Sequence, residues 1–259
     1  MSAALHAVPS VRDKVSKEEW QIRTDLAATY RLVAHHGWAD MIFTHISARV
    51  PGPEHHFLIN PYGMTFDEIT ASSLVKIDVD GNKVMDSPYP VNPAGFTIHS
   101  AIHMAREDAQ AVIHVHTADG VAVSCQEHGL LPISQHAMLV HGDVAYHDYE
   151  GVALNHDERP RLVNDLGTKN LFILRNHGTL TVGKTCADAF LRLYNLERAC
   201  TIQVKALAGG TKINQPNDGI PDVVTGQVSG MNDSSAFADK LVWPAMLRLL
   251  DRKDPSYRN

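Results

Sequence analysis

The chain has 259 residues, of which 44% are hydrophobic and 20% are charged. These proportions are ordinary for a globular protein, and the length is enough to bury one large core. The formal net charge of -6 at pH 7 leaves no excess of basic residues for phosphate backbones or anionic membranes, so we expect neither nucleic acid nor a membrane as partner. No stretch approaches the roughly 20 apolar residues of a membrane span, and the N-terminal segment lacks the apolar run of a signal peptide. We therefore expect a cytoplasmic protein.

A helix is predicted near the N-terminus. Ser16, followed three residues later by Glu19, has the pattern of a capping box, in which each side chain reaches the backbone N–H of the other residue. Apolar residues then recur at helical spacing as far as Gly37, and glycine is typical of the end of a helix.

The next segments favour β-structure. Residues 56–61 and 74–85 are rich in strand-forming side chains. The second segment contains the pair Asp80-Gly81, whose residues tolerate the positive φ angles of a tight hairpin. An antiparallel element is therefore expected here.

The middle of the chain alternates between helical and strand-like patterns. Apolar spacing predicts a short helix over 96–106, a strand over 111–116 and a second helix over 117–129. The apolar run at 171–178 has the length of a strand and ends at a glycine. The longest helical pattern follows over 185–209 and ends at a glycine pair.

The C-terminal part has a different composition. Residues 211–234 are rich in Asn, Pro, Gly and Asp, which favours an extended arm over an independent core. Pro244 lies in the middle of the last apolar stretch, so a kinked or broken helix is expected there. We divide the chain into an N-terminal tail (1–16), one domain (17–210) and a C-terminal arm with a helix (211–259) that packs on the domain or on a neighbouring subunit.

Two histidines in the predicted strand 111–116 are the first candidates for a functional site. Successive side chains of a strand point to opposite faces, so His114 and His116 share one face, with their Cα atoms about 7 Å apart. That spacing allows both rings to reach one ion at about 2.0 to 2.1 Å. The alternative is a pair of hydrogen-bonded histidines on a half-exposed strand.

His177 provides a third candidate, because it stands at the end of the second apolar strand, directly before a glycine. Alone it could be a histidine of a turn. Together with His114 and His116 it fits three facial ligands with open positions, which is typical of a catalytic metal site. Neutral imidazoles suit zinc first among divalent ions, with manganese, iron, cobalt or nickel as alternatives.

Several segments together resemble the class II aldolase and adducin head domain family. They are "HVHT" (114–117), "RNHG" (175–178), "LINPYGMTFDEITASSLVKID" (58–78) and "ADAFLRLYNLERACTIQVKAL" (187–207). The resemblance covers roughly residues 17–210, and it depends on the order and spacing of these segments more than on any one of them.

The resemblance implies an α/β fold of the class II aldolase type, a three-layer αβα sandwich with a mostly antiparallel central sheet. It further implies a homotetramer with active sites between subunits, and a divalent metal bound by His114, His116 and His177. In such aldolases the metal polarises a carbonyl and stabilises the enediolate that forms when a C–C bond breaks.

The sequence departs from the family's sugar-phosphate aldolases at two places. The glutamate that serves them as metal ligand and general base falls on Gly95, which can neither ligate nor accept a proton. Of their phosphate-binding segments only Gly63 is retained clearly, while the others fall on 44–47 and on Pro93-Ala94. A phosphorylated sugar is therefore not expected as the substrate.

Three further residues are candidates for proton transfer or substrate binding. Tyr146 matches, within one residue, a tyrosine that reaches the site of the adjacent subunit as proton donor; its alternative is a half-buried tyrosine at a sheet end. His136 could approach the site from a loop, or lie on the surface. His45 stands where the aldolases have a phosphate-holding asparagine, and a substrate carboxylate is a plausible partner for it.

Two functions remain open from the sequence. The first is a metal-dependent lyase-like enzyme, which performs aldol cleavage or decarboxylation of a small keto or hydroxy compound through a metal-stabilised enolate. The second is a non-catalytic oligomerisation module that keeps the metal-site histidines, because "VNPAGFTIHSAIHMARED" (91–108) resembles adducin heads more closely than sugar aldolases. Retention of all three histidines favours the enzyme, and Gly95 favours the module.

Overall fold

A seven-stranded sheet forms the centre of the computed structural model, which describes residues 8–152, 156–230 and 234–259. The strand order is β3-β2-β1-β4-β7-β6-β5, and every neighbouring pair is antiparallel except β5 with β6. The predicted, mostly antiparallel sheet is therefore confirmed. The strands are β1 (His45–Arg49), β2 (Phe57–Ile59), β3 (Val75–Ile77), β4 (Ala111–Val115), β5 (Val144–His147), β6 (Leu171–Leu174) and β7 (Gly178–Gly183).

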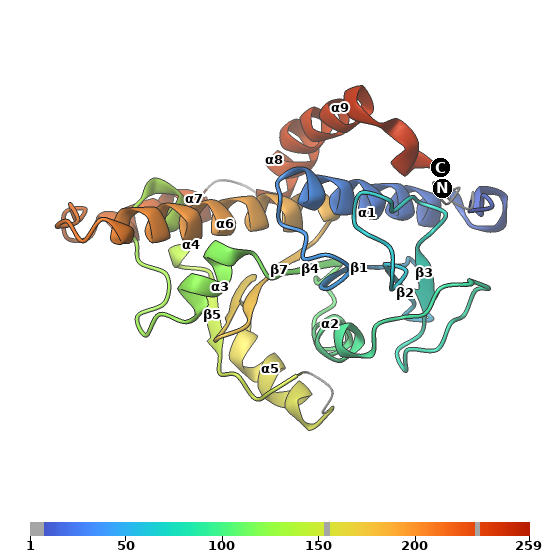
Figure 1. The fold of residues 1–259 in the computed structure, drawn as a ribbon, viewed down its shortest axis with the longest axis horizontal. Helices are drawn as coiled ribbons and strands as arrows, with labels where there is room; N and C mark the ends of the chain where they lie inside the picture. The colour runs from blue at the N-terminus through green and yellow to red at the C-terminus, as the bar shows by residue number, and fades with distance from the viewer. Residues whose placement is uncertain (1–7, 153–155, 231–233) are drawn as a thin grey trace, which may run out of the picture.

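Helices cover both faces of the sheet and complete the three layers (Figure 1). On one face lie α1 (Lys17–His35) and α6 (Cys186–Ala208), and on the other lie α2 (Pro93–Ala105) and α5 (Arg159–Leu166). None of the helices that the structure describes is long and apolar enough to cross a bilayer. The remaining helices are α3 (Ala118–Ser124), α4 (Gln135–His141), α7 (Ile220–Gly230), α8 (Ser234–Phe237) and α9 (Trp243–Lys253).

The alternation of side chains along β4 separates the two cores and positions the first histidine. Ile113 and Val115 pack into the core formed with α1 and α6, whereas Val112 packs into the core formed with α2 and α5. His114 lies on the same side as Val112, because its side chain is two positions further along the strand. The sheet thus directs this imidazole toward the α2 layer.

The predicted strand over 171–178 is wrong in extent, because two strands and a turn replace it. β6 ends at Leu174, and β7 begins at Gly178. Between them, the His177 N–H donates to the Leu174 carbonyl, and Asn176 has a φ of 56°, a conformation that Asn tolerates better than most residues. His177 is therefore the last residue of a tight turn.

Two helical predictions also differ from the structure. The helix expected over 117–129 ends at Ser124. The segment 211–234, expected as an extended arm, contains α7. Pro221 lies in the first turn of α7, where its missing N–H leaves no helical hydrogen bond unmade.

The last helical stretch is interrupted close to the predicted proline. A five-residue π-helical segment, Ala238–Val242, separates α8 from α9, and Pro244 lies in the first turn of α9. Trp243, Leu250 and Tyr257 then pack into the core beside α1. The C-terminal segment therefore adds apolar cover to the outer side of α1.

At the start of α1, the predicted capping box forms only in one direction. The Ser16 hydroxyl accepts the backbone N–H of Glu19 at 3.1 Å. The Glu19 carboxylate instead pairs with Arg23 and Lys76. Arg23 is fully buried and also donates to the carbonyls of Ala71 and Leu74, so this ion pair fixes α1 against the chain that enters β3.

We expect Glu19→Ala to lower the free energy of unfolding by about 3 to 5 kcal/mol, because it leaves the buried Arg23 charge without its partner. The double variant Glu19→Leu with Arg23→Met should lose less free energy of unfolding than the single variants Glu19→Leu and Arg23→Met summed. Urea unfolding measures these differences. Lys76→Ala, which removes the partly exposed second cation paired with Glu19, serves as a milder control. Additive losses in the double variant would contradict the buried coupling.

Candidate metal centre

Two backbone segments bring the three predicted histidines together. His114 lies near the end of β4, His116 directly follows that strand, and His177 ends the turn before β7. Each offers one ring nitrogen, and these nitrogens all lie within 4.8 Å of one another. His114 is buried, whereas the side chain of His116 is 26% exposed, so one side of the cluster remains open.

Hydrogen bonds on the far side of two rings determine which nitrogens carry protons. His114 Nδ1 lies 2.9 Å from the Thr179 carbonyl oxygen, which can only accept, so this nitrogen is the donor. His116 Nδ1 lies 3.2 Å from an Asp40 carboxylate oxygen and donates in the same way. In the neutral rings, both Nε2 atoms then present lone pairs. Histidines that bind metals are usually oriented in this way, with the other ring N–H donated to a carbonyl or a carboxylate.

The distances between these nitrogens suit a shared cation. His114 Nε2 lies 2.9 Å from His116 Nε2 and 3.3 Å from His177 Nε2. Two nitrogens about 2.1 Å from one ion lie about 3.0 to 3.4 Å apart when the angle between them is roughly 90 to 109°. Lone pairs that face each other at this range repel unless a cation lies between them, so the donor set fits a divalent metal.

Burial keeps the site in its ligating form. It lowers the pKa of His114 well below the ordinary value, with the neighbouring His177 and His116 adding to the effect. It lowers the pKa of His177 to about 4, again with His116 contributing. Both rings are therefore neutral at pH 7, which is the state that binds metal.

The glycine after His177 is required by close packing. A Cβ atom at Gly178 would lie 2.5 Å from the Val115 carbonyl oxygen and 3.1 Å from the His116 ring. Only a residue without a side chain lets β7 begin this close to the end of β4. Gly178 therefore sets how closely the segment that carries His177 approaches the segment that carries His114 and His116.

Glu197 of α6 links these two segments from behind. Its buried carboxyl group accepts hydrogen bonds from the hydroxyls of Thr117, next to His116, and of Thr179, whose carbonyl orients His114. Burial raises the pKa of Glu197 to about 7, although both hydroxyl hydrogen bonds favour the carboxylate. One side chain thus supports both halves of the histidine cluster.

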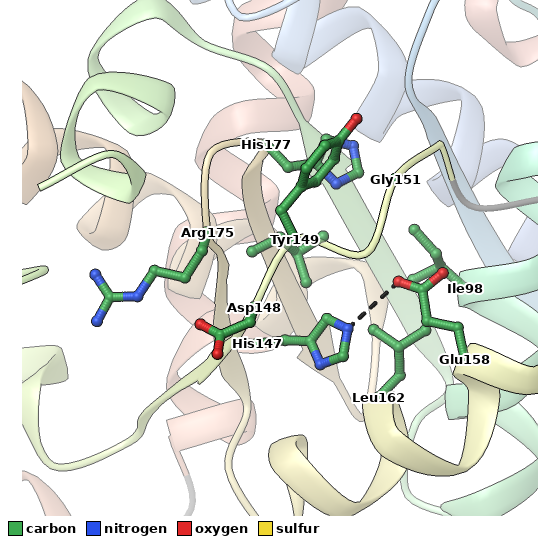
Figure 2. Close-up of a pocket in the computed structure, with 10 residues that line it drawn as sticks. Ile98, His147, Asp148, Tyr149, Gly151, Glu158, Leu162, Arg175 and His177 are labelled. Carbon is green, nitrogen blue, oxygen red and sulfur yellow. Dashed lines mark hydrogen bonds and ion pairs between the residues drawn. The ribbon is translucent and has the colours of Figure 1, made fainter. Parts of the chain in front are cut away.

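A small cleft adjoins His177 on the side of β5 and α5 (Figure 2). Tyr149 lies beside His177, with ring centroids 6.0 Å apart, and is 51% exposed. Deeper in the cleft, His147 is bound by two carboxyl groups, with Nδ1 2.7 Å from Asp165 and Nε2 3.3 Å from Glu158. His147 is therefore held in place, while Tyr149 borders solvent.

The predicted substrate-binding residues lie in different surroundings. His45 is buried beside the cluster, with its ring centroid 5.5 Å from that of His114. Gly63 has a φ of 107°, which favours glycine, and a side chain there would meet no described atom within 4 Å. Gly95 lies in the first turn of α2, and its surroundings are outside those that the structure describes.

The structure does not bring the two predicted proton-transfer residues to the histidines of the same chain. The Tyr146 hydroxyl accepts the Leu130 N–H, and its ring packs under the Arg175 guanidinium at 4.4 Å. His136 lies on α4, which packs against α6 and α7. Among the described contacts, neither residue therefore belongs to the three-histidine cluster of its own chain.

Sequence reasoning missed Asp40, Tyr149 and Glu197. Asp40 and Tyr149 lie in irregular segments where no periodic pattern singles them out. Glu197 carried a usable signal, because it is an acidic residue among the apolar positions of the long predicted helix, between Leu196 and Ala199.

Glu197→Leu should weaken zinc binding by roughly 10- to 100-fold, because it removes the group that orients both histidine segments. Glu197→Gln should stay close to the original affinity, since an amide can still hydrogen-bond both threonines. Competition with a chromophoric chelator measures the zinc dissociation constant, and Arg198→Ala on the same helix is the matched control. Unchanged affinity in a folded Glu197→Leu protein would exclude this role.

Comparison with known proteins agrees with this geometry. The Class II Aldolase and Adducin N-terminal domain family matches residues 24–204. An aldolase II superfamily protein of Pseudomonas syringae has a similar solved structure, with 51% identity, a TM-score of 0.90, and coverage of 97% of this chain and 100% of that one.

Two further relatives represent the two halves of the family's name. The solved L-fuculose 1-phosphate aldolase of Glaciozyma antarctica is 28% identical with a TM-score of 0.80, covering 97% of this chain and 96% of that one. Alpha-adducin of Mus musculus is 47% identical over 195 residues, which make up 74% of this chain and 26% of the adducin. The chain belongs to the class II aldolase and adducin N-terminal domain family.

Proposed function

We propose that this protein is a metal-dependent lyase-like enzyme that acts on a small keto or hydroxy compound, by aldol cleavage or decarboxylation. The observation that carries the proposal is the cluster of His114, His116 and His177, whose lone pairs converge while one side stays open. A purely structural site would be closed by a further protein ligand. The open side is where a substrate would bind.

The chain's own residues would divide the work as follows. His114, His116 and His177 would hold the ion, with zinc preferred and manganese, iron, cobalt or nickel as alternatives. When bound, such an ion polarises a substrate oxygen and stabilises the negative charge that develops as a carbon bond breaks. His45 and Gly63 would contact the substrate.

Proton transfer requires a group that Gly95 does not provide. We propose Tyr146 and His136 for this role, acting on the site of a neighbouring subunit in a homotetramer. Tyr146 packs against the core that contains Ala137 and Val140 of α4, and His136 lies on α4 itself. Neither belongs to the cluster of its own chain, which supports this assignment, since a cluster would then be completed across an interface.

The second candidate is a non-catalytic module like the adducin head. It is favoured by one specific observation: glycine at position 95, together with 47% identity to alpha-adducin over 195 residues. In that case the histidines would support assembly, and no substrate would be converted.

We expect protein purified without added ions to contain one divalent metal per chain, and to catalyse exchange of the α protons of dihydroxyacetone or pyruvate into heavy water. Elemental analysis and proton NMR measure these quantities. Metal without exchange, and without CO2 release across a panel of keto acids, would favour the adducin-like module.

His114→Ala and His177→Ala should abolish metal binding, because two ligands remain in each variant and the affinity of a site depends on all three. Removing the metal with a chelator should lower the Tm of the original protein, since an ion that binds only the folded state stabilises it. His128→Ala, at an exposed histidine, is the control. Unchanged metal content in the first two variants would remove these residues from the site.

A further inference from the structure

Four buried polar atoms without partners lie together beside the histidine cluster. Among the described residues, no hydrogen-bond partner exists for Thr44 Oγ1, for either ring nitrogen of His45, or for His99 Nε2. The three residues are only 3%, 4% and 2% exposed. Because buried polar groups are nearly always paired, such a concentration indicates a place where another molecule completes the hydrogen bonds.

Both rings are held close to the proposed metal ligands. His45 on β1 is the direct register partner of His114 on β4, so the two side chains share a face of the sheet. His99, on α2, packs on His45 with ring centroids 4.3 Å apart. It stands one helical turn after Gly95, the position at which the family's sugar-phosphate aldolases have a glutamate.

A chain of hydrogen bonds determines which His99 nitrogen carries the proton. His103 Nδ1 lies 2.7 Å from the Ala109 carbonyl oxygen and must donate to it, which leaves Nε2 of the neutral ring as an acceptor. The Ser47 hydroxyl, 2.7 Å away, therefore donates its single proton to His103 Nε2. Ser47 can then only accept from His99 Nδ1, at 2.6 Å.

His99 Nε2 is consequently a lone pair buried without a partner. Burial lowers the pKa of His103 to about 3, with the nearby Arg49 adding to the effect, so the first ring of the chain stays neutral. Burial likewise lowers the pKa of His99 well below its ordinary value. A carboxylate, which can only accept, would meet this lone pair unfavourably, whereas a hydroxyl group would donate to it.

We propose that His99 and His45 form a hydroxyl-binding subsite beside the three-histidine centre, in which His99 Nε2 accepts the proton of a ligand hydroxyl. The same hydroxyl oxygen can accept from the N–H of the neutral His45 ring. This inference rests on the proposed function, because the ligand is one whose other oxygens are bound at the metal. It replaces the carboxylate that the sequence suggested as partner of His45.

The subsite selects ligands by one functional group. A ligand with a hydroxyl beyond the oxygens bound at the metal satisfies His99, whereas an analogue without it leaves a buried acceptor unpaired. His99 is therefore a specificity-determining residue, and Ser47 is a positioning residue that acts by fixing the tautomer of His99.

The test compares three ligands on cobalt-loaded protein, whose visible spectrum reports binding at the metal. Dihydroxyacetone has the second hydroxyl, hydroxyacetone lacks it, and pyruvate has a carboxylate instead. We expect dihydroxyacetone to bind roughly 10- to 100-fold more tightly than hydroxyacetone, the range typical of an unpaired buried group.

His99→Phe should abolish that preference and leave the cobalt content and the hydroxyacetone affinity unchanged. Ser47→Ala should reduce the preference less, because His99 is then free to adopt either tautomer. His36→Phe is the matched control, since His36 also has an unpartnered ring nitrogen among the described residues but stacks on Trp38, which packs against the core on the α1 and α6 face of the sheet. It should keep the full preference.

Three results would overturn the proposal. A preference that persists in His99→Phe would show that the hydroxyl binds elsewhere, and equal affinities in the original protein would show that water alone fills the subsite. Loss of pyruvate binding in His99→Phe would assign the subsite to a carboxylate. If none of the ligands changes the cobalt spectrum, or no cobalt binds, the proposed function itself fails, and this subsite fails with it.

Discussion

The pairing of β4 with β7 is the constraint on which the site depends. It places the end of β4 beside the start of β7, so that His114 and His116 meet His177 across residues more than 60 positions apart in the chain. Gly178 permits the approach, because any side chain there would collide with the Val115 carbonyl. His114 donates a hydrogen bond to the backbone carbonyl of Thr179, which belongs to this same strand pair. The pairing that builds the sheet therefore also orients the His114 ring.

Buried polar groups and a strained backbone angle near the histidines raise the free energy of the folded state, and the rest of the fold must offset this cost. Several imidazoles are buried where apolar side chains would pack without a desolvation cost. Thr44, a β-branched residue, has a φ of 64°, a region such residues rarely adopt. Residues held in this way are found mostly where function requires them. Glu197 and the large cores on both faces of the sheet supply the rigidity that keeps the arrangement in place.

Family membership explains the scaffold but not the chemistry on it. The chain shares its fold with an L-fuculose 1-phosphate aldolase, and 74% of it aligns at 47% identity with 26% of alpha-adducin. It keeps three converging imidazoles and has glycine where a carboxylate base is expected. The buried pair His45 and His99 lies on the same side of the sheet, and its hydrogen-bonding capacity differs from that of a carboxylate. Differences of this kind allow one fold to serve several reactions.

The sequence by itself determined the features that local periodicity records. The long helices α1 and α6 and the strand β4 follow from patterns within short windows. The family follows from the order and spacing of several such segments, which also named the three histidines that the structure brings together. The boundary between β6 and β7 did not, because three polar turn residues lie inside what resembles one apolar run. Only the tertiary structure decided that Glu197 supports Thr117, 80 residues away, or that His45 faces His114. Such contacts depend on strand register and on how a helix packs on a sheet, and neither is encoded in the spacing of neighbouring residues.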